Sequence, residues 1–205
     1  MLAKVCTLAD SVLARAVVLG FAYWLSVILA IQLVFPDSRI ALFWPPNAIT
    51  VAALLLSSRK QWPLYLCATA VAYLVAIIPL TTMFISFVSS AANLVEIFIL
   101  AIVVRKFIPG PATYLKLPKI FPVIIWATVP AILISTSISS IRVIPTFDKA
   151  TFFNTWLGWF VGDLSGLLLV LPALLMWMTP GTPSFKSYNK NEVCPSSYKL
   201  EQSAA

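Results

Sequence analysis

Residues 83–104 read MFISFVSSAANLVEIFILAIVV, an apolar stretch long enough to cross a membrane, with Glu96 as its single acid. A second such stretch, residues 153–177, reads FNTWLGWFVGDLSGLLLVLPALLMW and has Asp163 as its single acid. A carboxylate in hydrocarbon is expensive, so it usually faces a partner or a cavity and marks a functional site. The two stretches therefore predict membrane helices whose acids carry the function.

The composition of the whole chain agrees with this interpretation. It is 60% hydrophobic and 10% charged, with a mean hydropathy of +0.96, whereas soluble domains are about 25% charged. A membrane helix needs about 20 apolar residues. We expect an all-α, polytopic transmembrane helix bundle of about six spans: Val12–Phe35, Pro46–Leu56, Pro63–Pro79, Met83–Val104, Phe121–Ile141 and Phe153–Trp177. The second span crosses only if Ile40–Pro45 also lies at membrane depth.

The basic residues predict the orientation of the bundle. With six spans, most of the 14 lysines and arginines fall on one side, and only Arg39, Arg142 and Lys149 fall on the other. The basic side of a membrane protein is cytoplasmic, so we expect both termini inside. The net charge of +7 then reflects topology and anionic lipid rather than nucleic-acid binding.

The end of the chain differs from the rest. Residues 179–205 are rich in Pro, Ser, Lys and Asn and have no apolar period. Such a composition cannot bury a core. We expect an integral membrane domain over residues 1–178 and a disordered cytoplasmic tail over residues 179–205.

The residue types limit the chemistry. The chain has no histidine, and Cys6, Cys67 and Cys194 lack the spacing of a metal or redox motif. No lysine lies inside a span, and no nucleophile–base pair is evident. We therefore expect no enzyme activity, no catalytic residue, no cofactor and no metal site.

Depth along the helices predicts that the acids are near each other. Glu96 is about 20 Å below Met83 and Asp163 about 15 Å below Phe153, at a rise of about 1.5 Å per residue. Both acids then lie near the midplane, where they would share a proton or face a common cavity if their helices are neighbours. Asn93 lies one turn from Glu96, and Ser86, Ser89 and Ser90 continue that stripe as a helix–helix seam.

Two further motifs concern packing and an unexplained polar group. Gly158, Gly162 and Gly166 form overlapping GxxxG steps, which let another helix of this chain or of a second copy approach closely. In Trp44-Pro45-Pro46-Asn47, the prolines are typical of a helix start and Trp44 suits the interfacial aromatic belt. Neither explanation accounts for Asn47, whose amide points into the membrane.

In these motifs the chain resembles the first type of membrane-associated sensor domain, the MASE group, found ahead of bacterial histidine kinases and diguanylate cyclases. The resemblance covers about Ala16–Trp177 and rests on four pieces of sequence: FWPPNAI at 43–49, Ser58-Arg59 followed by Trp62-Pro63, NLVE at 93–96 leading to Arg105-Lys106, and Trp156 through Asp163, Gly166 and Pro172. It implies a ligand-binding site made of Trp44, Asn47, Asn93, Glu96 and Asp163.

The resemblance also implies partners. Family members usually have a couple more membrane helices and a signalling output domain, so we expect this chain to be a truncated or orphan sensor in the lipid bilayer of a bacterial inner membrane. It would act on a missing output domain or a partner protein, as a monomer or a homodimer, in two-component or cyclic di-GMP signalling. The stimulus would be a small ligand or a proton in a polar cavity open to the outer side. The alternative is a small transporter or channel subunit that uses the acids as a cation relay.

Overall fold

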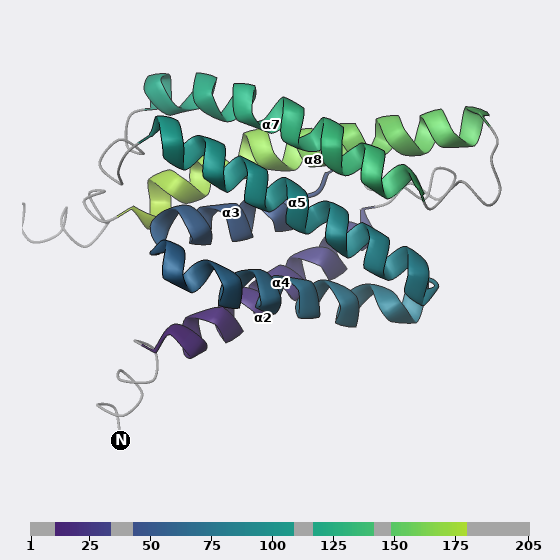
Figure 1. Cartoon of the computed structure of the whole chain (residues 1–205), viewed down its shortest axis with the longest axis horizontal. Helices are drawn as coiled ribbons and strands as arrows, with labels where there is room; N and C mark the ends of the chain where they lie inside the picture. The colour runs from purple at the N-terminus through teal and green to yellow at the C-terminus, as the bar shows by residue number, and fades with distance from the viewer. Residues whose placement is uncertain (1–10, 34–42, 109–116, 142–148, 180–205) are drawn as a thin grey trace, which may run out of the picture.

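The computed structural model describes residues 11–33, 43–108, 117–141 and 149–179, and the regular structure within these ranges is helical (Figure 1). Five helices are long and apolar enough to span a membrane, and a sixth is a shorter apolar helix. The prediction of an all-α bundle with about six membrane helices is confirmed. The helices are α2 Val12–Gln32, α3 Pro46–Leu56, α4 Trp62–Ile77, α5 Met83–Phe107, α7 Leu117–Ser140 and α8 Lys149–Met178.

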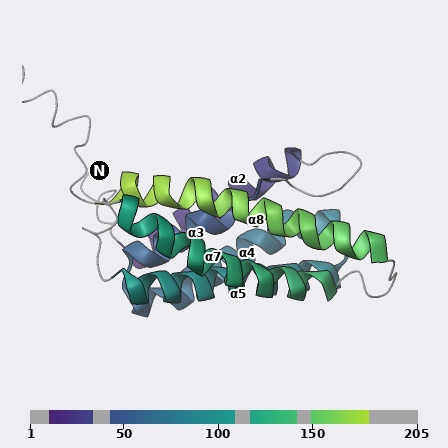
Figure 2. The same cartoon turned by 90° about the horizontal axis from the view of Figure 1, so that it is seen from above.

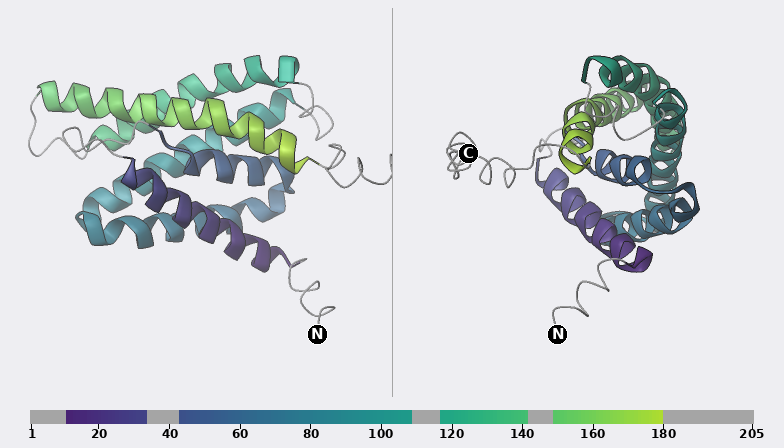
Figure 3. Two further views of the ribbon diagram at one scale, coloured as in Figure 1. Left: turned by 180° about the vertical axis from the view of Figure 1, so that it is seen from behind. Right: turned by 90° about the vertical axis from the view of Figure 1, so that its left-hand side faces the viewer.

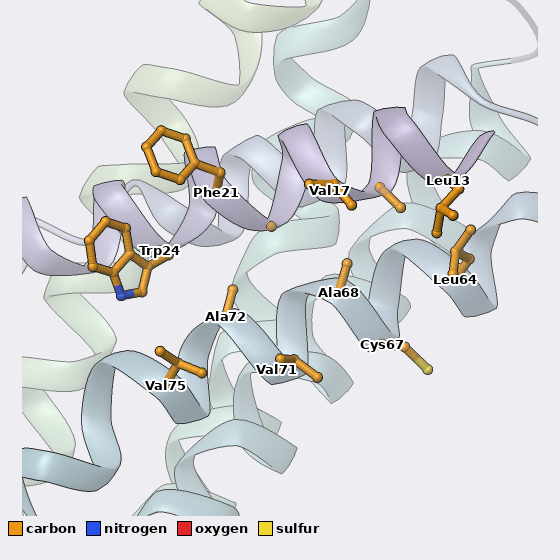
Figure 4. Close-up of a pocket in the computed structure, with 12 residues that line it drawn as sticks. Leu13, Val17, Phe21, Trp24, Leu64, Cys67, Ala68, Val71, Ala72 and Val75 are labelled. Atoms are coloured by element: carbon orange, nitrogen blue, oxygen red, sulfur yellow. The ribbon is translucent and has the colours of Figure 1, made fainter. Parts of the chain in front are cut away.

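The long helices lie side by side, as Figures 1 and 2 show. The most extensive contacts join α5 to α7, α2 to α4, and α7 to α8. Between α2 and α4 runs an open groove of about 610 Å³ with an almost wholly apolar lining. In Figure 4, Leu13 lies opposite Leu64 and Trp24 near Val75, so the two helices run in the same direction.

The short helix α3 occupies the centre of the bundle. It contacts α2, α4, α5 and α8, and Figure 3 shows it between the side formed by α8 and the side formed by α2. Its 11 residues reach about 16 Å at 1.5 Å per residue, about half of a hydrocarbon core of ~30 Å. The second span is therefore a half-helix, and the preceding Phe43–Pro45 has no regular structure. Residues 40–42, which the sequence also placed at membrane depth, lie outside the described ranges.

The other end of α3 is held by α5. The last carbonyl groups of a helix have no partner within it, and a cation at that end is favourable. The Nη1 atom of Arg105 donates to the carbonyl of Ser57 at 2.7 Å and to that of Leu54 at 3.2 Å. The indole Nε1 of Trp62 also donates to the Leu54 carbonyl, at 2.9 Å. The Arg105 guanidinium lies 5.6 Å from the centre of the Trp62 ring.

Candidate functional site

The start of α3 places the amide of Asn47 among three other side chains. Its Nδ2 atom donates to Asn93 Oδ1 and to Glu96 Oε1, both at 2.8 Å and both on α5. Its Oδ1 atom accepts a hydrogen bond of 3.1 Å from the hydroxyl of Tyr23 on α2. Asn47 and Tyr23 are fully buried, so this one amide connects three helices inside the bundle.

Glu96 receives a second donor from α7. The Ser135 hydroxyl lies 2.5 Å from Glu96 Oε2, so each carboxyl oxygen of Glu96 accepts a hydrogen bond. The Glu96 side chain is 0% exposed. Asn93 is fixed in turn, because its Nδ2 atom donates to the Ser89 carbonyl at 3.1 Å. Buried polar groups need such partners, since an unpaired one costs more than a hydrogen bond contributes.

Asp163 of α8 completes the cluster. Its carboxyl group interacts directly with that of Glu96 and also with Trp159. Asp163 is 1% exposed, and its Oδ2 atom has no hydrogen-bond partner within the described part of the chain. Two carboxylates in contact in an apolar surrounding do not both ionise without a compensating charge. The pair is therefore suited to hold one proton between its oxygens, or to accept a cationic or hydrogen-donating group.

The local sequence explains why a helix can begin at this depth. Irregular backbone is tolerated in the membrane only where protein covers it and its N–H groups find acceptors. Pro45 and Pro46 have no N–H, and the N–H of Trp44 donates to the carbonyl of Gly162 on α8 at 3.0 Å. A Cβ atom at Gly166 would lie 2.0 Å from the Trp44 carbonyl oxygen. Gly162 and Gly166 of α8 thus accommodate the irregular segment that precedes α3.

The structure brings together most of the residues that the sequence singled out, namely Asn47, Asn93, Glu96 and Asp163. Trp44 lies at the edge of this cluster. Its backbone bonds to the residue before Asp163, and its ring packs edge-on against Tyr73 with 6.4 Å between ring centres. The seam expected on α5 is buried as well, with Ser86 0%, Ser89 1% and Ser90 5% exposed.

Sequence reasoning missed Tyr23 and Ser135 as members of the cluster. Tyr23 is the only tyrosine in the first span, and a buried tyrosine hydroxyl usually finds a hydrogen-bond partner, which could have identified it. Ser135 is one of several hydroxyl residues near the end of α7. Which of these hydroxyl groups faces Glu96 depends on how α7 is rotated about its axis, and the sequence does not show that rotation.

The polar cavity open to the outer side, which the resemblance led us to expect, stays a prediction. The α2/α4 groove has none of the five predicted site residues in its lining, and neither does a second groove, between α2 and α8. Among the described residues, no three His, Cys, Asp or Glu side chains lie together as they would around a metal ion.

Comparison with known protein families identifies the chain. The model of the MASE1 family matches residues 13–200, most of the chain. The chain belongs to the MASE1 family. No curated protein and no solved structure matched it. MASE1 domains are membrane-integral, sensory and non-catalytic, so this chain is a multi-pass sensor domain that resides in a lipid bilayer.

The MASE1 assignment bears on two other expectations. It gives no support to the transporter or channel alternative. The match extends beyond residue 178, whereas residues 180–205 lie outside the described ranges. The division into a membrane domain over 1–178 and a disordered tail therefore stays a prediction.

Proposed function

We propose that this MASE1 domain detects a small ligand or a proton at the buried cluster formed by Trp44, Asn47, Asn93, Glu96 and Asp163. The response would pass to a signalling output domain or a partner protein of the histidine kinase or diguanylate cyclase class, in a bacterial inner membrane. The observation that carries the proposal is the contact between the carboxyl groups of Glu96 and Asp163, bridged to α3 by Asn47. A helix seam alone would not require two acids.

The cluster offers a physical basis for two states. Tyr23, Glu96 and Asp163 are its titratable groups, and each belongs to a different helix. Adding a proton, or a ligand that donates to the free Asp163 oxygen, changes which hydrogen bonds Glu96 can accept. A stimulus shifts a conformational equilibrium only if it binds the two arrangements with different affinity. The Asn47–Glu96 bond supplies such a difference, because it depends on the charge of Glu96.

Helix α3 is the element that would transmit the change. Asn47 ties its first turn to Glu96 of α5, and Arg105 of the same α5 binds the carbonyls of Leu54 and Ser57 at its last turn. A displacement of Asn47 would therefore shift the whole of α3, which is short, relative to α5. The displacement would reach Trp62 at the start of α4, which shares the Leu54 carbonyl.

The test uses the full chain fused to a reporting kinase or cyclase domain. Glu96→Gln and Asp163→Asn keep shape and hydrogen-bonding capacity while removing ionisation. We expect both variants to accumulate as wild type does, yet to lose the response of the fusion to external pH and to candidate ligands. Thr128→Val is the matched control, because Thr128 is a fully buried polar residue of α7 whose hydroxyl makes no hydrogen bond within the described part of the chain.

Two results would contradict the proposal. If the amide variants respond as wild type does, the carboxyl groups play no part in sensing. If they fail to accumulate while Thr128→Val accumulates normally, the acids hold the bundle together. Cation flux through vesicles that is abolished by the same variants would instead indicate transport.

A further inference from the structure

The groove between α2 and α8 differs in chemistry from the apolar groove between α2 and α4. Its volume is about 500 Å³, within the range of about 300–1,000 Å³ that proteins use for organic ligands. Helix α3 forms its floor through Ile49 and Ala53, and Val18 of α2 and Leu174 of α8 line its sides. Figure 3 shows α2 and α8 on either side of α3.

The polar groups of this groove gather at one end. Three residues with polar side chains line it: Arg15 in the first turn of α2, Ser57 directly after α3, and Tyr65 in the first turn of α4. This is the end of the bundle at which Arg59 and Lys60 also lie. Tyr65 is only 3% exposed, so most of its side chain is covered by protein, and it still contributes to the groove lining. A guanidinium and hydroxyl donors that line the same end of a groove are suited to an acceptor such as a phosphate oxygen, because a guanidinium has five N–H donors and a hydroxyl one.

We propose that this groove binds one anionic phospholipid, with its phosphate at Arg15 and Tyr65 and an acyl chain along Ile49 and Ala53. The apolar part alone would not select a ligand, because lipid tails are as apolar as the helices they surround. Selection comes from the charged end. A guanidinium pairs with phosphate oxygens in a bidentate manner, and basic pockets between membrane helices bind anionic headgroups.

Native mass spectrometry of the delipidated full chain tests the proposal. The probes are phosphatidylglycerol and phosphatidylcholine with identical acyl chains. We expect one tightly bound phosphatidylglycerol and a clear preference for it over phosphatidylcholine. Arg15→Gln should reduce that preference about fivefold, and Tyr65→Phe should weaken phosphatidylglycerol binding. Ala53→Phe, which fills the floor of the groove, should lower the binding of both lipids.

The controls separate this site from general surface effects. Arg59→Gln removes an equal charge at the same end but outside the groove, and Val71→Phe adds bulk to the α2/α4 groove instead. Both should bind lipid as wild type does. Ala22→Phe places bulk on the α2 wall of the same groove and replaces Ala53→Phe if that variant does not fold.

Three results would overturn the proposal. The first is a lipid preference that Arg15→Gln leaves unchanged. The second is an equal loss in Arg15→Gln and Arg59→Gln, which would mean diffuse attraction between the basic end and anionic lipid. The third is competition by glycerol 3-phosphate as strong as that by the lipid itself, which would identify a site for a soluble phosphate.

Discussion

The side-chain amide of Asn47 donates two hydrogen bonds and accepts one, and its partners are Asn93, Glu96 and Tyr23. These contacts connect α2, α3 and α5 through side chains that are buried inside the bundle. Hydrogen bonds between membrane helices contribute about 0.6 kcal/mol each on average, because the unfolded state in the membrane also finds partners. Leaving a buried group unsatisfied costs more, about 1–3 kcal/mol. At the scale of single residues, the stability of the domain therefore depends more on whether Glu96 keeps its hydrogen-bond donors than on how many hydrogen bonds the cluster contains.

We predict that Asn47→Ala destabilises the domain by about 1–3 kcal/mol, because it leaves an oxygen of the buried Glu96 carboxyl without its donor. Tyr23→Phe leaves one buried group, the Asn47 Oδ1 atom, without its partner, whereas Asn47→Ala leaves three, so Tyr23→Phe should cost only about 1 kcal/mol, the lower end of that range. Thermal unfolding of the purified variants in detergent measures the difference. Equal losses in the two variants would show that the amide does not stabilise the carboxyl group.

At the scale of elements, the decisive feature is a helix that starts within the bundle. The irregular Phe43–Pro45 segment precedes α3 and lies against α8, where the Trp44 N–H finds the Gly162 carbonyl. Gly166 permits this close approach, because its missing side chain leaves room for the Trp44 carbonyl. The overlapping GxxxG steps of α8 were expected to face another helix. At Gly166 they face the irregular backbone of Trp44 and Pro45 instead.

We predict that Gly166→Ala lowers stability by at least about 1–3 kcal/mol, the usual cost of overpacking. The added Cβ would lie 2.0 Å from the Trp44 carbonyl oxygen and 2.4 Å from its carbon, and backbone atoms cannot rotate away. Gly20→Ala is the matched control, because its Cβ would lie 3.4 Å from the Ala68 carbonyl oxygen. Yield and thermal stability in detergent measure both changes. Equal tolerance of the two substitutions would contradict the close approach of α8 to Trp44.

At the scale of the whole molecule, the described basic side chains lie at one end of the bundle. Arg15 is near the start of α2, Arg59 and Lys60 follow α3, Arg105 and Lys106 end α5, and Lys119 is near the start of α7. The short α3 reaches this end although it does not span the membrane, so the helices still alternate in direction. The charge pattern then predicts that this end faces the cytoplasm.

We predict that reporter fusions after Leu80 and after Lys149 report the outer side of the membrane, and that a fusion after Pro118 reports the cytoplasm. The reason is the excess of basic residues at the end where α5 stops and α7 begins. Paired alkaline phosphatase and fluorescent protein fusions give opposite signals on the two sides. An outer signal at Pro118 would overturn the orientation.

The amino-acid sequence was enough to predict the membrane class, the number of helices and most of their bounds. It also placed Glu96 and Asp163 at similar depth. These properties are local: the cost of a charge in hydrocarbon and the length of an apolar stretch depend on the residues of that stretch alone. The resemblance in the FWPPNAI and NLVE motifs was enough to indicate the family that the match over residues 13–200 confirms.

Which of these residues contact one another could be seen only in the folded bundle. The contact of Glu96 with Asp163, the place of Tyr23 and Ser135, and the approach of Gly166 to Trp44 depend on how each helix is rotated and tilted. The apolar pattern leaves that rotation open, because these helices are apolar around most of their circumference. Rotation and tilt are set by packing against neighbouring helices, and that packing exists only once the bundle has formed.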